Sequence, residues 1–452
     1  MFIGWTAPMI PYLISEESHI KTTKHEAECL ESAFLIGVFC GLPLTIIFTE
    51  KIGRRRSLLF AMFLMSVAWL PMVFAHKIIH IYVCRFLGGV AGNMAFVTAP
   101  MYVAEIADQK IRGLLSSFIY LSILTGCLVM YCVGPYLPFY ASPLIGGFIS
   151  LIELAMFYSM PESPYYLLYK DKNIEAKKSL EYFRPNEDVW NEIQEMSDAI
   201  KRQKTERGRI KDFVLVKSHR KALLIILIMH AGQHLSGIHV ILMNLHLIMR
   251  EAGAIYLKES TTGIIFSVIM LIASTAASFQ VDKYGRKVLL VTSSILSGFC
   301  LFTIAVYFNV KYAGYDTLSF SWIPIVAVMS YAASFKIGLG LVPVTITAEL
   351  FSAKMKSKGM TAAEAMFAIF SLITVQLYLW LANSFGIHVP FYIFSSCTFL
   401  LTFFIIYYIP ETKGKTLEEI QLILMGHKSN HASKDELKTD PVETSLIIQN
   451  VE

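Results

Sequence analysis

Charged residues are scarce in this chain. Asp, Glu, Lys and Arg together make up 16% of its 452 residues, whereas hydrophobic residues make up 55%. A soluble globule of this length needs far more polar surface than that. The shortage of charge therefore excludes a soluble globular protein and predicts a membrane protein.

Cysteine is also infrequent, and catalytic motifs are missing. The seven cysteines have neither zinc-binding nor disulfide spacing, and all but Cys29 lie in or beside apolar runs. The sequence contains no nucleophile with a base, no phosphate-binding loop and no cluster of metal ligands. It therefore does not predict an enzyme, and we expect neither a cofactor nor a bound metal.

Long apolar runs are abundant. A helix that crosses the hydrocarbon needs about 20 residues, and eleven runs are long enough, which predicts an all-α membrane protein. They lie at residues 32–49, 57–75, 78–103, 114–131, 142–160, 223–249, 261–281, 288–308, 321–347, 361–381 and 389–409.

A twelfth apolar segment, residues 2–14, is shorter than a crossing and contains Pro8 and Pro11. No basic residue precedes it and no small-residue cleavage site closes it, so a secretory signal peptide fits poorly. We interpret it as the outer part of a truncated first helix, whose inner part is missing from this chain.

Positive charge is concentrated in the loops on one side. Four short loops there carry twelve Lys and Arg, whereas the loops on the other side carry six, mixed with acids. The positive-inside bias makes the first group cytoplasmic, together with the central segment and the C-terminal tail. Charges that orient helices do not indicate a nucleic-acid partner. The twelve are Lys51, Arg54, Arg55, Arg56, Lys110, Arg112, Lys283, Arg286, Lys287, Lys354, Lys356 and Lys358.

Three short signals occur twice, at offsets of 232, 244 and 249 residues. Such a repeat indicates a duplicated half, and many secondary transporters are built from membrane repeats with the substrate held between them. The pairs are Gly53-Arg54-Arg55 with Gly285-Arg286-Lys287, Glu105-Ile106-Ala107 with Glu349-Leu350-Phe351, and Pro161-Glu162-Ser163 with Pro410-Glu411-Thr412.

The repeat divides the chain into four parts. Residues 1–160 and 222–409 form two six-helix halves, residues 161–221 a cytoplasmic linker, and residues 410–452 a cytoplasmic tail that we expect to be mostly disordered. The linker contains two apolar patterns at helical spacing, which predict short amphipathic helices. The patterns are Ile174, Leu180 and Phe183, then Val189, Ile193, Met196 and Ile200.

Further motifs extend over nearly the whole chain. They are Arg85 with Gly88 and Gly92, Pro100-x-Tyr102-x-x-Glu105 with Arg112-Gly113, Pro161-Glu162-Ser163-Pro164, Gln233-His234-Leu235-Ser236-Gly237-Ile238, Asp282 with Gly285-Arg286-Lys287, and Pro410-Glu411-Thr412-Lys413-Gly414. With these motifs the chain resembles a sugar porter of the major facilitator superfamily. Gly4-Trp5-Thr6 with Pro8 and Ala99-Pro100-Met101-Tyr102 resemble the insect branch similar to facilitated trehalose transporters. The resemblance implies the major facilitator fold, with twelve transmembrane helices, the first truncated, in two six-helix halves.

The resemblance also implies a cytoplasmic gate. In this family, charged loop residues form salt bridges that hold the halves together while the outer side is open. Lys356 stands where Arg is usual, and because Lys lacks the forked geometry of Arg, its bridge is expected to be weaker. The alternative is that these charges only set topology. The gate residues carried over are Glu50, Gly53, Arg54, Arg55, Glu105 and Arg112, with Asp282, Gly285, Arg286, Lys287, Glu349 and Lys356.

The seventh span carries the sugar signal. Residues 233–239 match the family's Gln-Gln-Leu-Ser-Gly-Ile-Asn stretch, in which Ser-Gly interrupts the helix and amides face the substrate. Only Gln233 is unchanged, because His234 and His239 replace a Gln and an Asn. Asn244 adds an amide farther along.

Other sugar positions depart from the family pattern. Tyr120 stands where a Gln is usual, Met270 approximately where an Asn is, and Phe367 and Ala368 near an Asn-Trp pair. Residues 338–344 lack the first Pro and the Trp of the tenth span. Each lost hydrogen bond is worth about 1 kcal/mol, so we expect weak hexose binding or another preferred solute.

Two charged residues and two histidines within spans have alternative roles. A charge at the bilayer centre costs about 3 kcal/mol, so it usually faces a cavity or a partner. Lys336 either recognises a charged or polyol substrate or forms an ion pair, and Glu364 either couples protons or lies at an interface. His230 and His234 have zinc-compatible spacing, but no Cys or carboxylate joins them, so we expect them to line a polar cavity.

The resemblance implies facilitative transport of a sugar or sugar-like solute, trehalose or a hexose, by alternating access in the plasma membrane. The alternatives are a transport-deficient membrane sensor or interaction protein on the same scaffold, and proton-coupled symport. The expected partners are a sugar or polyol and the lipid bilayer, without nucleic acid, and no oligomer is required. The substrate-binding candidates are Gln233, His234, His239, Asn244, Tyr120 and Lys336.

Overall fold

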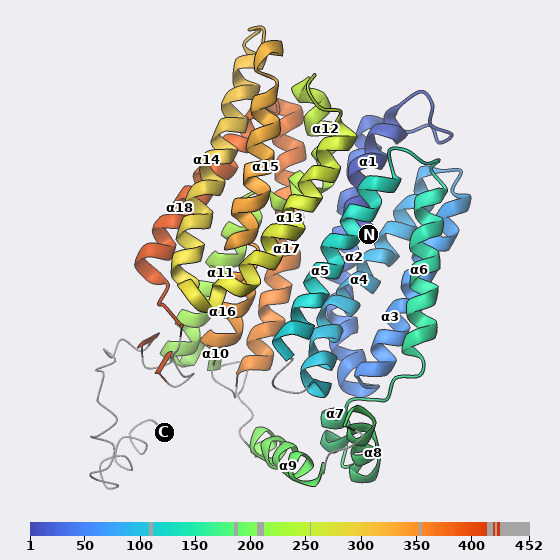
Figure 1. The fold of residues 1–452 in the computed structure, drawn as a ribbon, viewed down its shortest axis with the longest axis vertical. Coiled ribbons are helices and arrows are strands. Elements are labelled where there is room, and N and C mark those ends of the chain that lie inside the picture. The colour runs from blue at the N-terminus through green and yellow to red at the C-terminus, as the bar shows by residue number, and fades with distance from the viewer. Residues whose placement is uncertain are drawn as a thin grey trace.

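The computed structural model describes residues 1–107, 112–184, 189–205, 212–253, 255–351, 355–413, 419–420 and 423–424. Two bundles of long helices stand side by side, and short helices lie below one end (Figure 1). Within the described part, nine helical segments are long and apolar enough to cross a membrane, and three shorter apolar helices accompany them. The expected all-α membrane fold with twelve spans is therefore confirmed.

The first bundle comprises six spans. They are α1 (Phe2–Ile14), α2 (Lys24–Lys51), α3 (Arg54–Trp69) continued by η1 (Leu70–Phe74), α4 (Ile78–Ile106), α5 (Arg112–Val133) and α6 (Ala141–Phe157).

The second bundle also comprises six spans, two of which are interrupted. They are α11 (Lys217–Leu235) with α12 (Ile238–Ala252), α13 (Glu259–Tyr284), α14 (Arg286–Tyr312), η2 (Leu318–Phe320) and α15 (Trp322–Ile337) with α16 (Val342–Leu350), α17 (Lys356–Phe385) and α18 (His388–Tyr408). Short helices α7 (Pro164–Tyr169), α8 (Asn173–Phe183), α9 (Trp190–Thr205) and α10 (Asp212–Leu215) come between the two bundles in the chain.

Close backbone contact holds α2 against α4. A Cβ on Gly37 would lie 2.1 Å from the carbonyl oxygen of Phe86, and a Cβ on Gly89 would lie 2.1 Å from that of Phe34. Small residues let membrane helices approach until their backbones touch, which replaces the hydrophobic driving force that lipid does not supply. The first bundle is therefore packed through glycine contacts that a larger side chain would separate.

The seventh and tenth spans are both broken at glycines. The seventh breaks at Ser236-Gly237, as the sequence predicts, and Gly237 has a left-handed φ of +79°. The tenth breaks between α15 and α16, where a Cβ on Gly338 would lie 2.2 Å from the carbonyl oxygen of Leu289. Interrupted helices expose backbone polar groups inside the bundle, which transporters use for polar ligands.

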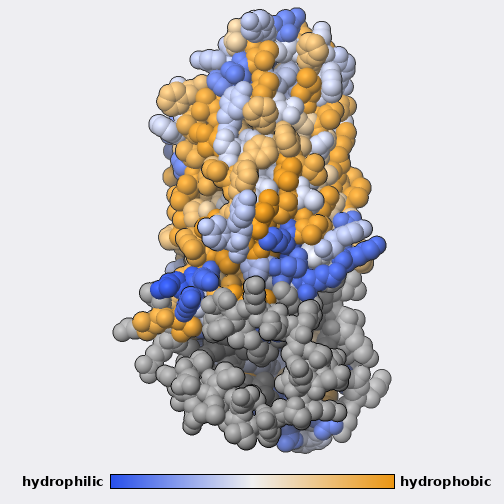
Figure 2. All heavy atoms as spheres, turned by 90° about the vertical axis from the view of Figure 1, so that its left-hand side faces the viewer, coloured by the Kyte–Doolittle hydropathy of each residue, from blue (hydrophilic) through white to orange (hydrophobic). Residues whose placement is uncertain are grey.

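The two ends of the molecule differ in charge. We call the end that holds the Gly53 and Gly285 turns the basic end and the opposite end the far end. Figure 2 shows a broad apolar belt above a band of hydrophilic side chains. Aromatic side chains such as Phe299, Phe302 and Phe403 are exposed on α14 and α18, and an apolar outer surface of this kind suits lipid.

The linker helices α7, α8 and α9 lie at the basic end (Figure 1). Both predicted amphipathic helices are present, and a small core separate from the main one forms among Leu180, Val189 and Ile193. Ile174 is the exception to the pattern, since its side chain is 77% exposed. The predicted disorder of the tail concerns residues that lie outside those described, apart from a few at its start.

The short first helix is buried on most sides. Trp5 donates from Nε1 to Ser142 Oγ at 3.1 Å, and Arg85 donates from Nη1 to the carbonyl oxygen of Phe2. The guanidinium of Arg85 also lies 4.8 Å from the ring centre of Phe34, a cation–π distance. Arg85 thus fastens α1 and α2 to α4.

Candidate functional site

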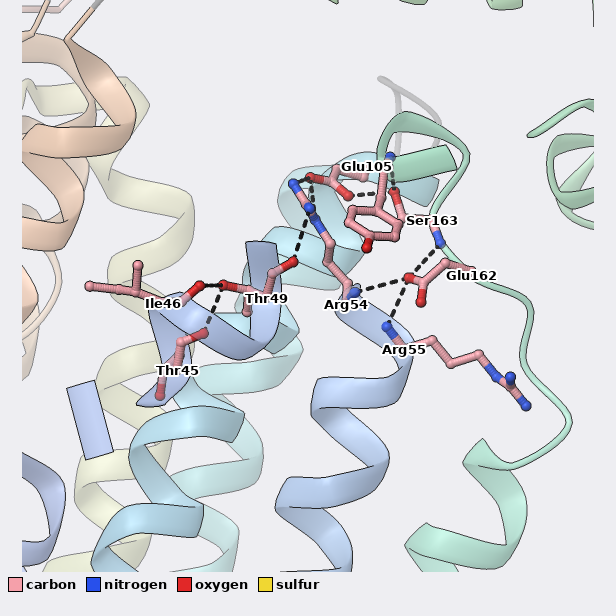
Figure 3. Close-up of polar contacts among 9 residues, drawn as sticks. Thr45, Ile46, Thr49, Arg54, Arg55, Glu105, Glu162 and Ser163 are labelled. Atoms are coloured by element: carbon pink, nitrogen blue, oxygen red, sulfur yellow. Dashed lines mark hydrogen bonds and ion pairs between the residues drawn. The ribbon is translucent and has the colours of Figure 1, made fainter. Parts of the chain in front are cut away.

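An ion pair at the basic end joins α3 to α4 in the first half. Arg54 donates from Nε and Nη2 to Oε1 of Glu105, at 3.0 and 2.8 Å, and from Nη1 to the carbonyl oxygen of Thr49 at 3.4 Å (Figure 3). The second carboxylate oxygen of Glu105 accepts from Ser163 Oγ. Because both partners of the pair are largely buried, at 13% and 14% side-chain exposure, solvent screens it less than a surface pair.

A second carboxylate caps the start of α3. Oε1 of Glu162 accepts from the backbone N–H groups of Arg54, Arg55 and Ser163, at 3.0, 2.9 and 3.0 Å. Helix N-termini leave such donors free, and a carboxylate there is favoured by the helix dipole. Gly53 has φ +97°, and a Cβ on it would lie 2.4 Å from Glu162 Oε2. The turn therefore requires glycine so that Glu162 can reach the helix end.

The second half repeats this arrangement. Arg286 donates from Nη2 to Glu349 Oε1 at 3.1 Å, and Glu411 accepts from the backbone N–H groups of Arg286 and Lys287, both at 3.0 Å. Gly285 has φ +91°, and a Cβ on it would lie 2.7 Å from Glu411 Oε2. Partial burial alone would raise the pKa of Glu411, but the backbone donors of Lys413, Arg286, Lys287 and Thr412 outweigh it and hold the pKa below its usual value.

Even the outer contacts of the two turns correspond. Arg55 donates from Nη2 to the carbonyl oxygen of Tyr158 at 2.6 Å, and Lys287 donates from Nζ to that of Ile406 at 2.7 Å. Each cation reaches the end of the last span of its own half, where helix carbonyls favour positive charge. The duplication seen in the sequence is thus a duplication of contacts.

One contact is not repeated. Ser163 bonds Glu105 in the first half, whereas Thr412 at the matching place in the second half is buried and its hydroxyl has no hydrogen-bond partner among the described residues. The second cluster therefore has one hydrogen bond fewer at this position.

Glu162 and Glu411 were not among the gate residues expected from the sequence, although they accept the most backbone hydrogen bonds in the two turns. The signal was present, because Pro161-Glu162 recurs as Pro410-Glu411. The sequence does not show that each glutamate caps the helix that begins after the turn glycine. That helix lies more than a hundred residues earlier in the chain than its glutamate.

Not every expected gate residue joins the clusters. Glu50 has an exposed side chain, and no hydrogen bond or ion pair is described for it. The side chains of Arg112, Asp282 and Lys356 lie outside the described part of the structure, so their roles stay predictions.

The ion pairs described at the two glycine turns each lie within one half. Arg54–Glu105 connects helices of the first bundle, and Arg286–Glu349 connects helices of the second. The expectation that gate charges bridge the two halves therefore stays a prediction. It applies to a conformation in which the basic end is closed.

The described hydrogen bonds between side chains of different halves lie toward the far end. Asn244 donates from Nδ2 to Glu31 Oε2 at 3.0 Å, and Asn383 donates from Nδ2 to Glu28 Oε2 at 3.2 Å. Gln376 donates to Ser32 Oγ on the same face of α2. These bonds fasten the start of α2 to α12 and α17, so the halves are held together at the far end.

Polar candidates from the seventh span gather around its break. Gln233 donates from Nε2 to the carbonyl oxygen of Leu339, in the break of the tenth span, at 2.8 Å. His234 Nδ1 lies 3.2 Å from Ser371 Oγ, and its ring is stacked on that of His239 with centroids 4.9 Å apart. The Phe367 ring stands edge-on to the His234 ring at 4.5 Å. We call these five side chains the central cluster.

Several polar atoms of the central cluster have no described partner. Gln233 Oε1, His234 Nε2 and His239 Nδ1 are buried without a hydrogen bond in the described structure. Buried polar groups are normally paired with protein, water or ligand. The unpaired atoms show where a polar solute or water would gain hydrogen bonds.

No described hydrogen bond joins the other substrate candidates to the central cluster. Asn244 is engaged with Glu31, although its Oδ1 is unpaired. Lys336 lies at the end of α15, where a Cβ on Gly340 would come 2.9 Å from its Cδ. The side chain of Tyr120 lies outside the described part, and Glu364 is partly buried in α17 without a described ion pair.

Comparisons with known proteins all point to one family of membrane transporters. The family described as sugar (and other) transporter matches residues 1–424. Facilitated trehalose transporter Tret1 of Drosophila virilis is 28% identical over 411 residues, which are 90% of this chain and 44% of that protein. Tret1 of Polypedilum vanderplanki is 27% identical over 449 residues, 97% of this chain and 88% of that protein. The chain thus spans about half the length or less of the first curated relatives it matches.

Solved structures show the same fold. The proton:xylose symporter XylE bound to 6-bromo-6-deoxy-D-glucose superposes with a TM-score of 0.72 at 23% identity, over 94% of this chain and 96% of XylE. An inward open conformation of Escherichia coli XylE gives 0.75 at 21% identity, over 93% and 96%. A peptide transporter gives 0.63 at 12% identity, over 89% and 90%. Identities this low establish the major facilitator fold alone.

Proposed function

Because the chain belongs to the sugar transporter family, we propose that it carries a sugar or sugar-like polar solute, trehalose or a hexose, across the membrane by alternating access. The observation that supports this most strongly is the central cluster, where Gln233 bridges the breaks of the seventh and tenth spans beside unpaired polar atoms of His234 and His239. Sugars need many directed hydrogen bonds, and helix breaks inside a bundle supply them.

The contacts suggest how the two ends alternate. Hydrogen bonds from Asn244 and Asn383 to α2 hold the far end closed, and they must break for that end to open. At the basic end, the Arg54–Glu105 and Arg286–Glu349 pairs make each half rigid by itself. We propose that rocking the halves brings these two clusters together and closes the basic end.

We propose that the basic end faces the cytoplasm of a cell whose plasma membrane holds the protein. Its support is the concentration of Lys and Arg in the loops of this end, with the linker helices beside them. We expect a bulky maleimide to react with a cysteine placed at the exposed Lys178 of α8 only after the plasma membrane is permeabilised.

Uptake of radiolabelled trehalose, glucose and a polyol into oocytes tests the transport proposal. We expect saturable uptake of at least one of them, lost in Gln233→Ala, with surface expression of both forms measured by biotinylation. The matched control is Gln280→Ala, an amide in the same half on α13, away from the central cluster. Absence of uptake for every solute, with the protein at the surface, would contradict the proposal.

A membrane sensor that binds but does not transport is the second candidate. It is favoured by the aromatic and apolar side chains, Phe367 and the fully buried Met270, at positions where the family resemblance implies amides. A ligand-dependent rise in unfolding temperature without uptake would support the sensor, whereas uptake would exclude it.

A further inference from the structure

A cavity of about 570 Å³ opens at the basic end, between the turn from α2 to α3 and the linker helices α7 and α8. Its size is within the range of small-molecule sites, about 300 to 1,000 Å³. Five of its lining residues are cations, three from the turn and two from the linker. They are Lys51, Arg55, Arg56, Lys170 and Lys172.

The two acids that line this cavity are already engaged. Glu162 accepts three backbone hydrogen bonds at the turn, and Glu175 forms an ion pair with Lys172 at 2.8 Å. Each acid keeps its negative charge, so the five cations outnumber the two acids by three. An excess of positive charge faces the cavity.

Three of the cations have no carboxylate partner in the described structure. Lys51 and Arg56 are exposed, and Lys170 lies 5.7 Å from the ring centre of Tyr166. In addition, Nε of Arg55 is buried without a hydrogen bond. Figure 3 shows Arg55 directed away from the Arg54–Glu105 pair, so it is not part of that ion pair. These donors can serve an external anion.

The second half provides an internal comparison. Its turn repeats the glycine and the first two cations as Gly285-Arg286-Lys287, but the position that matches Arg56 is Val288. The second turn keeps the same backbone capping by Glu411 without this cation. Arg56 is therefore not required by the fold of the turn, and its charge is an addition specific to the first half.

Exposed apolar side chains adjoin the cavity. Ile52, one of its lining residues, is 37% exposed, and Phe60 and Phe63 are exposed on the helix that follows. A bilayer that covers these aromatic side chains places its headgroups at the level of the cavity. Clusters of four to eight Lys and Arg just cytoplasmic of a membrane helix are suited to phosphorylated anionic lipids.

We propose that this cavity binds the phosphorylated inositol headgroup of a polyphosphoinositide in the cytoplasmic leaflet. Each phosphomonoester carries a charge of about −1.5 to −2 and strong acceptor oxygens, which the Arg and Lys side chains satisfy by charge-assisted hydrogen bonds. The inference rests on the proposed orientation of the basic end and does not depend on a sugar being the substrate.

The test is lipid-dependent thermal stabilisation of the purified full chain in detergent. The probes are the dioctanoyl forms of phosphatidylinositol 4,5-bisphosphate, phosphatidylserine and phosphatidylcholine, with soluble inositol 1,4,5-trisphosphate as the free headgroup. We expect the bisphosphate lipid to raise the unfolding temperature most and phosphatidylcholine to have no effect. Arg56→Val with Lys170→Ala should reduce the stabilisation by at least half.

A matched control removes two cations from the same end without touching the cavity. Lys178→Ala with Lys283→Ala does so, since both side chains are exposed and neither lines the cavity. Lys170→Gln alone, at an exposed position, repeats the test with a minimal change in case the double variant folds poorly.

The outcomes separate the alternatives. Retention of the shift in the control and its loss in the cavity variants support the site. Equal loss in the control, or no shift in the intact protein, would overturn the site. A shift with inositol trisphosphate as large as that with the lipid would overturn the assignment to a lipid.

Discussion

The side-chain amide of Asn244 in α12 donates to the carboxylate of Glu31 in α2 at 3.0 Å, across the boundary between the two halves. Both side chains are almost completely buried, at 1% and 0% exposure. Asn383 and Gln376 add further bonds from α17 to the same helix. The far end is therefore closed by amide groups of the second half that bond side chains of the first.

Removing this link should destabilise the closed far end. Asn244→Ala leaves the Glu31 carboxylate buried without its amide, which costs about 1–3 kcal/mol. We expect a lower unfolding temperature for the purified protein. Combined with Glu31→Leu, which removes the acceptor, the two changes should be non-additive, because each removes the same bond.

Asn309→Ala is the matched control for Asn244→Ala. Its amide donates to Tyr392 at 3.3 Å within the second half, at an exposed position. Its loss should alter stability by no more than about 0.5 kcal/mol. Equal destabilisation by both variants would show that the bond between the halves has no special role.

The two turn glycines should tolerate no side chain. Gly53→Ala and Gly285→Ala would place a Cβ 2.4 and 2.7 Å from the capping carboxylates of Glu162 and Glu411. Each variant must displace its glutamate from the helix end, in addition to the strain of a positive φ. We expect a lower yield of folded protein in size-exclusion chromatography and a lower unfolding temperature.

Gly314→Ala separates backbone strain from collision. Gly314 has φ +86°, but nothing lies within 4 Å of its added Cβ. It should therefore cost only the strain, about 1 kcal/mol, and less than either turn variant. If Gly314→Ala lowered the stability as much as Gly53→Ala does, displacement of the capping glutamate would not explain the cost of the turn variants.

The Glu411 cap predicts a pH dependence. Backbone donors lower the pKa of Glu411 in the folded protein below its usual value of 4.5. A carboxylate with a lowered folded pKa stabilises the protein above its unfolded pKa, and this contribution is lost as pH falls through the folded value. The difference in unfolding temperature between the intact protein and Glu411→Gln should thus be largest near neutral pH and shrink below about pH 4.5. A difference that is constant over this range would contradict the prediction.

The unequal contacts of Ser163 and Thr412 give a matched pair of variants. Ser163 bonds Glu105 and also accepts from the backbone N–H of Tyr166 at 3.2 Å, at the start of α7. Ser163→Ala should therefore cost about 1–2 kcal/mol, as loss of a helix cap does. Thr412→Val replaces an unpaired buried hydroxyl by a methyl group and should be neutral or stabilising. Thermal unfolding of both variants measures the two stability changes. A larger loss of stability in Thr412→Val than in Ser163→Ala would contradict the unequal contacts of the two hydroxyls.

Much of the fold could be predicted from the chain because each span carries its own apolar signal. The break at Ser236-Gly237 also follows a local motif. These features need only the residues of one half. The turns of the two halves fold alike because the same residue types recur there.

What the sequence could not show is how one half faces the other. The sequence marked Asn244 as a substrate-binding candidate, which stays a prediction, but it did not show that the amide donates to Glu31 of the first half. The orientation of α12 toward α2 depends on packing between the two bundles, which the repeated turn motifs do not encode. Glu31 and Glu28 carried no motif, so nothing in the sequence marked them as partners of buried amides.

The histidines of the central cluster offer a test of the lost sugar positions. His234→Gln with His239→Asn restores the amides that the family resemblance implies, and an amide presents donor and acceptor together where each ring now has an unpaired nitrogen. At about 1 kcal/mol per hydrogen bond, each restored bond should lower the KM for glucose about fivefold.

His230→Gln is the control, since His230 is buried on the same helix as His234, with its ring 6.5 Å from the His234 ring. Glucose-dependent thermal shift, measured beside uptake, detects a gain in binding even where transport is slow. A gain as large in His230→Gln, or weaker glucose binding in the double variant, would show that the two histidines are not the sugar positions.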